Sequence, residues 1–239
     1  RQRGALQVCD PSVPASRCAQ ALADAAAFFA RPQADKDALA IARSPHFRGY
    51  SRMHNARDWR EQIHFGPERA CASGDAPWAR LEGPNLWPDD AAWRDRMRAY
   101  GAAVEGLGHR LLSLVAQGLG LPAHAFASDH PPYLLMKLIA YHPQAEARPL
   151  RSGVAAHLDF SWVTLTLQDG TGGLEVMAPD GRWIAVDPVP GAWLVNVGEL
   201  LQFATRGALV ATPHRVLNPS SSRSRVSIPV FINPGLQDS

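Results

Sequence analysis

The sequence predicts a mixed α and β fold, in which a mainly helical first part precedes a double-sheet β barrel or jelly roll. Apolar residues recur from Trp93 to Leu114 at alternating steps of four and three, which predicts a long helix ending near Gly120. After His130 the chain changes to short apolar strands separated by turn signals. The 239 residues, 46% of them hydrophobic, can bury one core as a single domain.

Residues 1–130 are predicted to form the mainly helical flank of this domain. Residues 21–30 (ALADAAAFFA) are rich in good helix formers, and residues 35–42 predict a second short helix after the breaker Pro32. The apolar stripe from Trp93 to Leu114 is assigned to packing, because one apolar face of a helix normally covers the core.

A stretch of about residues 44–88 connects these helices. It is rich in Arg, Pro, Gly and Trp, which is typical of long connections, with one short strand near Gln62–Phe65. Loops of this length often line binding sites. Four basic or imidazole side chains of the stretch are therefore candidates to face a pocket mouth and favour an acidic group on its ligand: Arg48, Arg52, Arg60 and His64.

Residues 131–239 are predicted to form the jelly-roll core. Apolar residues alternate with Thr in WVTLTLQ, and turn clusters such as DGTGG, APDG and DPVPG separate the next strands. The spacing of strands and turns is that of a double-sheet barrel or jelly roll. The expected strands include residues 133–141, 163–167 and 225–232.

Composition argues against several kinds of partner. The 24 basic and 22 acidic side chains nearly cancel, giving a formal charge of +2, so no nucleic acid or anionic membrane surface is expected as a partner. No apolar run reaches the roughly 18 residues that span a bilayer. The three cysteines form no CxxC pair, which favours a reducing compartment, and we expect a cytoplasmic protein. Because the chain begins with Arg and an apolar stretch follows almost at once, we expect the natural protein to start earlier.

His157, Asp159 and His214 are the candidate metal ligands. His157 and Asp159 stand two apart in an extended segment, so their side chains project to the same face. His214, in an apparent strand after a turn, supplies a third ligand from a distant part of the barrel. Two histidines and one carboxylate on one face of an ion suit Fe(II), with Zn, Mn and Co as competitors.

Arg225 and Ser227 are the candidate anion-binding pair. They are also two apart, on one face of the last strand, so a guanidinium and a hydroxyl converge on one point inside the barrel. An Arg aimed into a cavity is costly to desolvate unless an anion meets it. An organic acid between this pair and the metal is therefore expected.

The order HxD, distant His, RxS resembles that of the iron- and 2-oxoglutarate-dependent oxygenases, specifically the isopenicillin N synthase-like branch. The likeness extends over nearly the whole chain: QDGTGGLEV is similar to the strand-turn-strand that ends in GGLQV, and PGAWLVNVGELLQFATRG is similar to the segment that carries VNxGD ahead of HRV. In the helical part, FFARPQADK, RGY and DWREQIHFG resemble the branch's FFxLPxxxK, GY and WxE motifs. The start GALQVCDPSV is similar to GFFQVxNHGV but lacks its HG.

This resemblance implies a double-stranded β-helix (jelly roll) core and a set of residue roles. His157, Asp159 and His214 would bind Fe(II), and Arg225 and Ser227 would hold the distal carboxylate of 2-oxoglutarate, the cosubstrate used with O2. Tyr141 matches the Tyr of the NYYP strand, a further cosubstrate contact, although Ile139 and Ala140 replace the two residues before it. Asp159 is a carboxylate, unlike the Ala or Gly of the iron halogenases.

The expected reaction is oxidation of a small organic substrate by hydroxylation, desaturation or cyclisation, and a place in specialised metabolism is expected. Two alternatives stay open at this point. One is an oxidase of the isopenicillin N synthase type, in which RxS grips the substrate and no 2-oxoglutarate is consumed. The other is a non-catalytic jelly-roll module that binds a small molecule, with zinc as its metal. The sequence carries no signal of oligomeric state.

Overall fold

The structure is a computed structural model that describes residues 4–55, 58–71, 74–143, 152–217 and 222–238. Two β-sheets form its centre, and all neighbouring strands within them are antiparallel. The larger sheet has seven strands in the order β1 (Ala5–Val8), β9 (Trp193–Val197), β6 (Val163–Gln168), β11 (Arg225–Gly235), β4 (Pro132–Tyr141), β3 (Trp59–Phe65), β2 (Gly49–His54). The smaller has the order β5 (Ser152–His157), β10 (His214–Leu217), β7 (Leu174–Met177), β8 (Trp183–Ala185).

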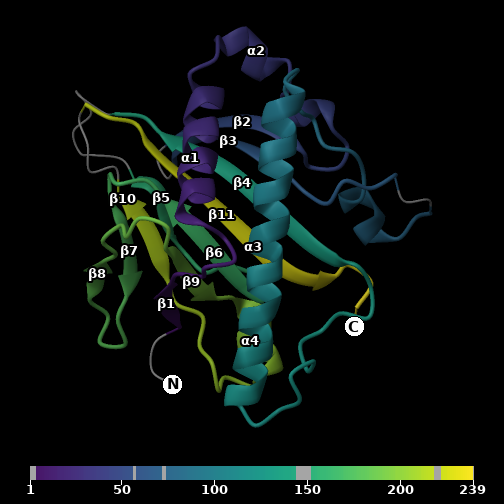
Figure 1. Ribbon diagram of the computed structural model, residues 1–239, viewed down its shortest axis with the longest axis vertical. Coiled ribbons are helices and arrows are strands. Elements are labelled where there is room, and N and C mark those ends of the chain that lie inside the picture. The colour runs from purple at the N-terminus through teal and green to yellow at the C-terminus, as the bar shows by residue number, and fades with distance from the viewer. Residues whose placement is uncertain (1–3, 56–57, 72–73, 144–151, 218–221, 239) are drawn as a thin grey trace.

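The two longest helices cover the outer face of the large sheet (Figure 1). α1 (Ala15–Phe29) and α3 (Ala91–Gly118) contact β11, and α3 also contacts β6. The indole N–H of Trp193 in β9 donates to the Tyr100 hydroxyl of α3 over 3.1 Å, which satisfies two polar groups in the core. The short helices are α2 (Gln33–Asp37), α4 (Glu199–Ala204) and the 3-10 turns η1 (Ile41–Arg43) and η2 (Pro77–Leu81).

The strands of the large sheet divide their side chains between the helices and a cavity. In β11, Val226, Ile228, Val230 and Ile232 are buried in the core, while Arg225, Ser227, Pro229, Phe231 and Asn233 line the cavity. β4 alternates in the same way, because successive side chains of a strand point to opposite faces. The inner face of the large sheet meets the small sheet in a second apolar cluster that contains Ile139, Tyr141, Leu174, Leu194 and Val216.

The predicted long helix is present, but its buried face moves off the predicted stripe before the end of the helix. Trp93, Met97 and Leu107 are buried, whereas Leu114 is 62% exposed, so its assignment to packing is wrong. A strict alternation of four and three has a period of 3.5, and a helix of 3.6 residues per turn drifts by about 20° per heptad from it. Over three heptads the drift turns Leu114 away from the sheet, and Leu112 is buried instead.

The first 130 residues contribute more than a helical flank. β1 and the β2–β3 pair come from this part and form the two edges of the large sheet, so the sheet crosses the predicted boundary at residue 130. The strand expected near Gln62–Phe65 is β3, which pairs with β2 in a region predicted to consist of connections. The helix expected at residues 35–42 is interrupted, because Ala40 adopts an extended conformation and bridges to Tyr50.

Candidate active site

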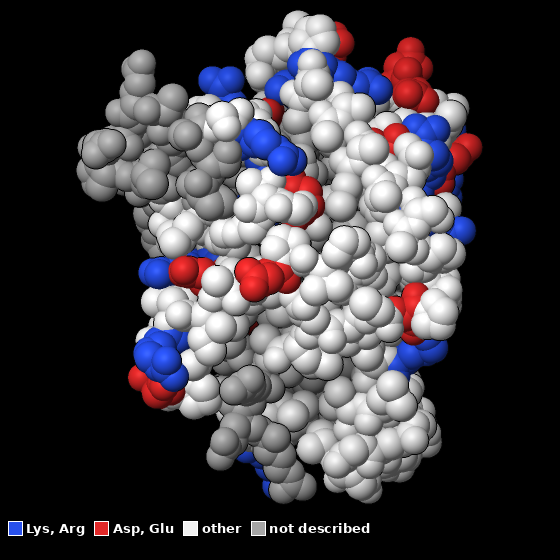
Figure 2. Space-filling model, turned by 60° about the vertical axis from the view of Figure 1, so that its left-hand side comes forward, with Lys and Arg blue, Asp and Glu red and all other residues white. Residues whose placement is uncertain are grey.

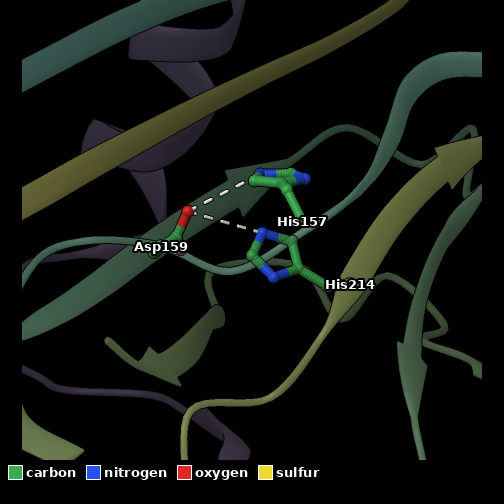
Figure 3. Close-up of side chains that lie close together, drawn as sticks. All are labelled: His157, Asp159 and His214. Carbon is green, nitrogen blue, oxygen red and sulfur yellow. Dashed lines mark ion pairs between the residues drawn. The ribbon is translucent and has the colours of Figure 1, made fainter. Parts of the chain in front are cut away.

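His157, Asp159 and His214 meet at the open end of the small sheet (Figure 3). His157 ends β5 and His214 begins β10, and the strand register places these two residues directly opposite each other. Asp159 follows β5 by two residues, and its Oδ1 lies 3.6 Å from Nε2 of each histidine. One ligand atom from each residue falls within 4.8 Å of the others, which is the spacing of a three-ligand metal site.

Backbone carbonyls orient both imidazole rings. Nδ1 of His157 lies 2.9 Å from the Ala155 oxygen, and Nδ1 of His214 lies 3.2 Å from the Thr212 oxygen. A carbonyl oxygen can only accept, so each Nδ1 carries the proton and each Nε2 keeps its lone pair. Both lone pairs therefore point toward Asp159, the arrangement in which histidines bind a metal (Figure 3).

The electrostatics of the cluster fit a divalent cation. Asp159 is 5% exposed, and its Oδ2 is buried without a hydrogen-bond partner. Burial, reinforced by the neighbouring His214, holds the pKa of His157 below its usual value, which favours the neutral imidazole that binds metals. A buried carboxylate with one unpartnered oxygen, beside two imidazoles whose Nε2 atoms face it, suits Fe(II) in chemical type and in donor number.

Arg225 and Tyr141 face each other across the β4–β11 pair, in the same cavity. Arg225 is fully buried, its Nε donates to the Gly172 carbonyl over 2.6 Å, and its Nη2 donates to Oε1 of Gln168 over 3.1 Å. Its Nη1 is buried and has no partner. The guanidinium carbon lies 4.9 Å from the centre of the Tyr141 ring. The guanidinium is thus held rigidly with one edge unsatisfied, which fits an incoming anion.

All six predicted site residues line one cavity of about 930 Å³. Ser227 is 2% exposed and follows Arg225 on the same face of β11. The face of the molecule drawn in Figure 2 carries acidic and basic side chains in small groups of both signs. The six residues are His157, Asp159, His214, Arg225, Ser227 and Tyr141.

The arginines expected at the pocket mouth divide between different roles. Arg60 lines the cavity. Arg48 does not reach it: this side chain is fully buried and donates to the carbonyls of His46 and Leu81 and to the Tyr133 hydroxyl, so its predicted place at the mouth is wrong. Arg52 is exposed and contacts Gln33, and His64 does not line the cavity. A charge count over a loop cannot distinguish these environments.

The sequence interpretation missed the residues that support and extend the site. Gln168 and Gly172 position Arg225, and Gly172 has φ +80°, a conformation that glycine adopts without strain. Lys137 lines the cavity from the same face of β4 as Tyr141. A signal for Lys137 existed, because it lies four residues before Tyr141 in a predicted strand, and residues an even number apart share a face.

Known proteins share both the sequence pattern and the fold. The family model of the 2OG-Fe(II) oxygenase superfamily matches residues 132–234, and that of the non-haem dioxygenase in morphine synthesis N-terminal matches residues 1–90. A 2-oxoglutarate-dependent dioxygenase of Gibberella zeae is 32% identical over 98% of this chain and 68% of its own length. The chain thus spans about two thirds of that relative.

Two solved structures extend the comparison to ligands. A full-length Neurospora crassa protein in complex with alpha-KG has a TM-score of 0.83 at 25% identity, covering 97% of this chain and 76% of its own. JOX2 in complex with 2OG, Fe and JA has a TM-score of 0.82 at 25% identity, covering 98% and 68%. The predicted jelly-roll fold is confirmed. The chain belongs to the 2-oxoglutarate- and iron(II)-dependent oxygenase superfamily, whose cofactors are Fe(II) and 2-oxoglutarate, used with O2.

Proposed function

We propose that this chain oxidises a small organic substrate at Fe(II) held by His157, Asp159 and His214, with 2-oxoglutarate anchored by Arg225 and Ser227. The observation that carries the proposal is the unpartnered Nη1 of the fully buried Arg225, in the same cavity as the unpartnered Oδ2 of Asp159. A buried cation and a buried anion that do not satisfy each other call for ligands of opposite charge, here an organic acid and a metal ion.

The site residues have separate proposed roles in holding the iron and the cosubstrate. Nε2 of both histidines and the Asp159 carboxylate would occupy one face of the iron and leave the opposite face to ligands. Iron held there would supply the activation of O2, which is coupled to the oxidative decarboxylation of 2-oxoglutarate. Arg225, fixed by Gln168 and Gly172, would orient the distal carboxylate through charge-assisted hydrogen bonds, and the Ser227 hydroxyl would donate to the same group.

Tyr141 is proposed to hold Arg225 in place. Its ring contacts the guanidinium and also lies close to Gly153, where an added Cβ would be 2.6 Å from the ring. The cationic group stacked on an aromatic face is stabilised without consuming a hydrogen-bond donor. The unpartnered Nη1 of Arg225 therefore stays available for the cosubstrate.

The substrate is proposed to be a small molecule. The cavity of about 930 Å³ lies within the range of small-ligand sites. Related structures carry 5-formyluracil in the case of the Neurospora crassa protein and JA in the case of JOX2.

No helix among the described residues is long and apolar enough to cross a membrane. Residence in a reducing compartment stays a prediction, supported by three free cysteines in the described chain.

The proposal is tested by anaerobic titration of the metal-free protein with Fe(II) and then with 2-oxoglutarate. The expected result is a visible charge-transfer band that requires both additions and weakens in Arg225→Met. The matched control is Arg182→Met, which removes an exposed arginine paired with Asp180 outside the cavity. Succinate release would then report turnover on candidate substrates.

The other outcomes of this titration identify the alternatives. Iron binding without a band, together with an unchanged Arg225→Met variant, would contradict the use of 2-oxoglutarate and favour the oxidase of the isopenicillin N synthase type. Failure of the protein to bind iron would favour a non-catalytic binding module. A His157→Ala variant that retains full iron-dependent turnover would refute the assignment of the ligands.

A further inference from the structure

Lys137 is a cationic side chain on the wall of the active-site cavity that the chemistry above does not use. It lies in the middle of β4 and faces inward with Leu135, Ile139 and Tyr141. Its register neighbour on β3 is His64. Lys137 is therefore part of the inner surface of the large sheet, which the cavity exposes to a bound ligand.

The ammonium group of Lys137 has no anionic partner among the described residues. Within the described part of the chain no carboxylate forms an ion pair with it at 4.0 Å or less, and its Nζ lies 4.7 Å from the centre of the Phe231 ring. Burial and the positive charge of Arg60 lower the pKa of Lys137 to about 8, and the negative charge of Asp159 opposes this effect. A cation that is desolvated, repelled by a second cation and left unpaired is stabilised by an anion that enters the cavity.

Arg60 adds a second positive group to this wall. It also lines the cavity, its Nε is buried without a partner, and its Nη1 lies 3.6 Å from Asp58. On the same face of β3, Oε1 of Gln62 is buried without a partner. The wall formed by β3 and β4 thus offers two cations to an anionic ligand group and one amide oxygen that can accept a hydrogen bond, with Asp58 as the carboxylate that partly balances Arg60.

Lys137 is displaced along β4 from the cosubstrate anchor. Lys137 and Tyr141, which faces Arg225, are four positions apart, so at about 3.3 Å per residue their backbones are about 13 Å apart. An extended five-carbon diacid is only about 7 Å long, from C–C bonds of about 1.5 Å. Lys137 instead interacts electrostatically with Asp159, one of the candidate metal ligands.

We propose that Lys137, assisted by Arg60, binds a carboxylate of the primary substrate, and that the substrate class is an organic acid with an apolar body. The rest of the cavity matches this body: Leu135, Leu158, Phe160, Leu200 and Phe231 line it. Leu158 and Phe160 flank Asp159, so an acid held at Lys137 places its apolar part beside the metal ligands. The inference rests on the proposed function only in treating this cavity as the substrate site.

The test compares acids with their neutral amides. Calorimetric titrations with phenylacetate, 4-phenylbutyrate and the corresponding amides are made on wild type, Lys137→Met, Lys137→Arg and the surface control Arg182→Met. The protein is saturated with 2-oxoglutarate to block Arg225, and each titration is made with anaerobic Fe(II) and without metal. We expect wild type, Lys137→Arg and Arg182→Met to prefer at least one acid over its amide about tenfold or more, and Lys137→Met to lose that preference.

Two results would overturn the inference. One is an equal affinity of wild type for each acid and its amide, which includes the absence of saturable acid binding. The other is an acid preference that survives in Lys137→Met. The charge-transfer titration of Lys137→Met separates this inference from the proposed function: a normal band with lost acid preference supports both, whereas a missing band in wild type refutes the cosubstrate assignment and leaves the metal-free comparison of acid and amide binding valid.

Discussion

The strongest quantitative prediction concerns the replacement of Arg225 by Met, which separates ligand binding from folding. In the ligand-free protein Arg225 is a fully buried cation, and among the described residues no carboxylate lies within 4.0 Å of it. Its removal relieves the desolvation of a charge and leaves the Gly172 carbonyl and the Gln168 amide without their donor. Because these effects oppose each other, we expect the ligand-free variant to melt within a few degrees of wild type.

The effect on cosubstrate binding should be much larger. A hydrogen bond to a charged group contributes about 1.5–3 kcal/mol, so loss of the guanidinium is expected to weaken 2-oxoglutarate binding by about 100-fold. A ligand present at 100 times its Kd stabilises the folded state by about 2.7 kcal/mol, which in a chain of this size raises Tm by about 5–11 °C. At the same concentration the variant would gain about 0.4 kcal/mol, or about 1–2 °C.

Anaerobic differential scanning calorimetry with Fe(II), at zero and saturating 2-oxoglutarate, measures both quantities. Arg182→Met serves as the control and should show the full shift of wild type. An Arg225→Met variant that keeps the full ligand-induced shift would refute the assignment of Arg225 as the carboxylate anchor. A large loss of Tm without ligand would show instead that Arg225 acts as a structural charge.

Three further predictions concern the surroundings of the site. Burial raises the pKa of the Glu61 carboxyl, but hydrogen bonds from His142, Lys36 and Tyr50 outweigh this and lower it to about 2 from the usual 4.5. The ionised Glu61 therefore adds about 3 kcal/mol to the free energy of unfolding above pH 4.5, and this stability is lost as the pH falls toward 2. In Glu61→Gln, the free energy of unfolding measured by acid denaturation should lose this part of its pH dependence. Gly153→Val should displace the Tyr141 ring and weaken 2-oxoglutarate binding about tenfold or more in the anaerobic titration, whereas unchanged binding would show that the ring does not position Arg225. Gly108→Ala places a methyl group 2.5 Å from Ile232 and should lower the free energy of unfolding by about 1–3 kcal/mol in urea, with 2-oxoglutarate affinity retained; an unchanged urea midpoint would indicate a looser α3–β11 contact.

The site could be predicted because its residues follow the period of a β-strand. His157 and Asp159, like Arg225 and Ser227, stand two apart, so each pair had to share a face once its segment was extended. The structure adds the register, which sets His157 opposite His214. That pairing joins segments 57 residues apart in the chain and depends on tertiary contacts that no local pattern encodes.

The structural features that the sequence did not predict correctly also depend on tertiary contacts. β2 and β3 lie in a stretch rich in Arg, Pro and Gly, and they form strands because β4 offers β3 a free edge to pair with. The β-strand propensity of a segment reflects only the local cost of an extended conformation. Whether the segment forms a strand depends on the backbone hydrogen bonds that it makes with a neighbouring strand. Arg48 could not be distinguished from Arg60 for a similar reason: strand register and packing place one inside the protein and the other on the cavity.

The two faces of β3 and β4 show how the fold separates structural charges from binding charges. On the outer face, Glu61 pairs with Lys36 at 2.8 Å and accepts a 2.5 Å hydrogen bond from the Tyr50 hydroxyl, so this buried carboxylate is satisfied within the protein. On the inner face, Lys137 has no anionic partner within 4.0 Å among the described residues, and Arg60 keeps its Nε unsatisfied. A partly desolvated cation whose polar atoms are not all paired destabilises the ligand-free protein, and a ligand of opposite charge reverses that cost on binding. Glu61 on β3 is satisfied within the protein, whereas its neighbour Arg60 on β3 and Lys137 on β4 line the cavity with incomplete pairing. This contrast is the physical reason to assign Lys137 and Arg60 to recognition of an acidic substrate.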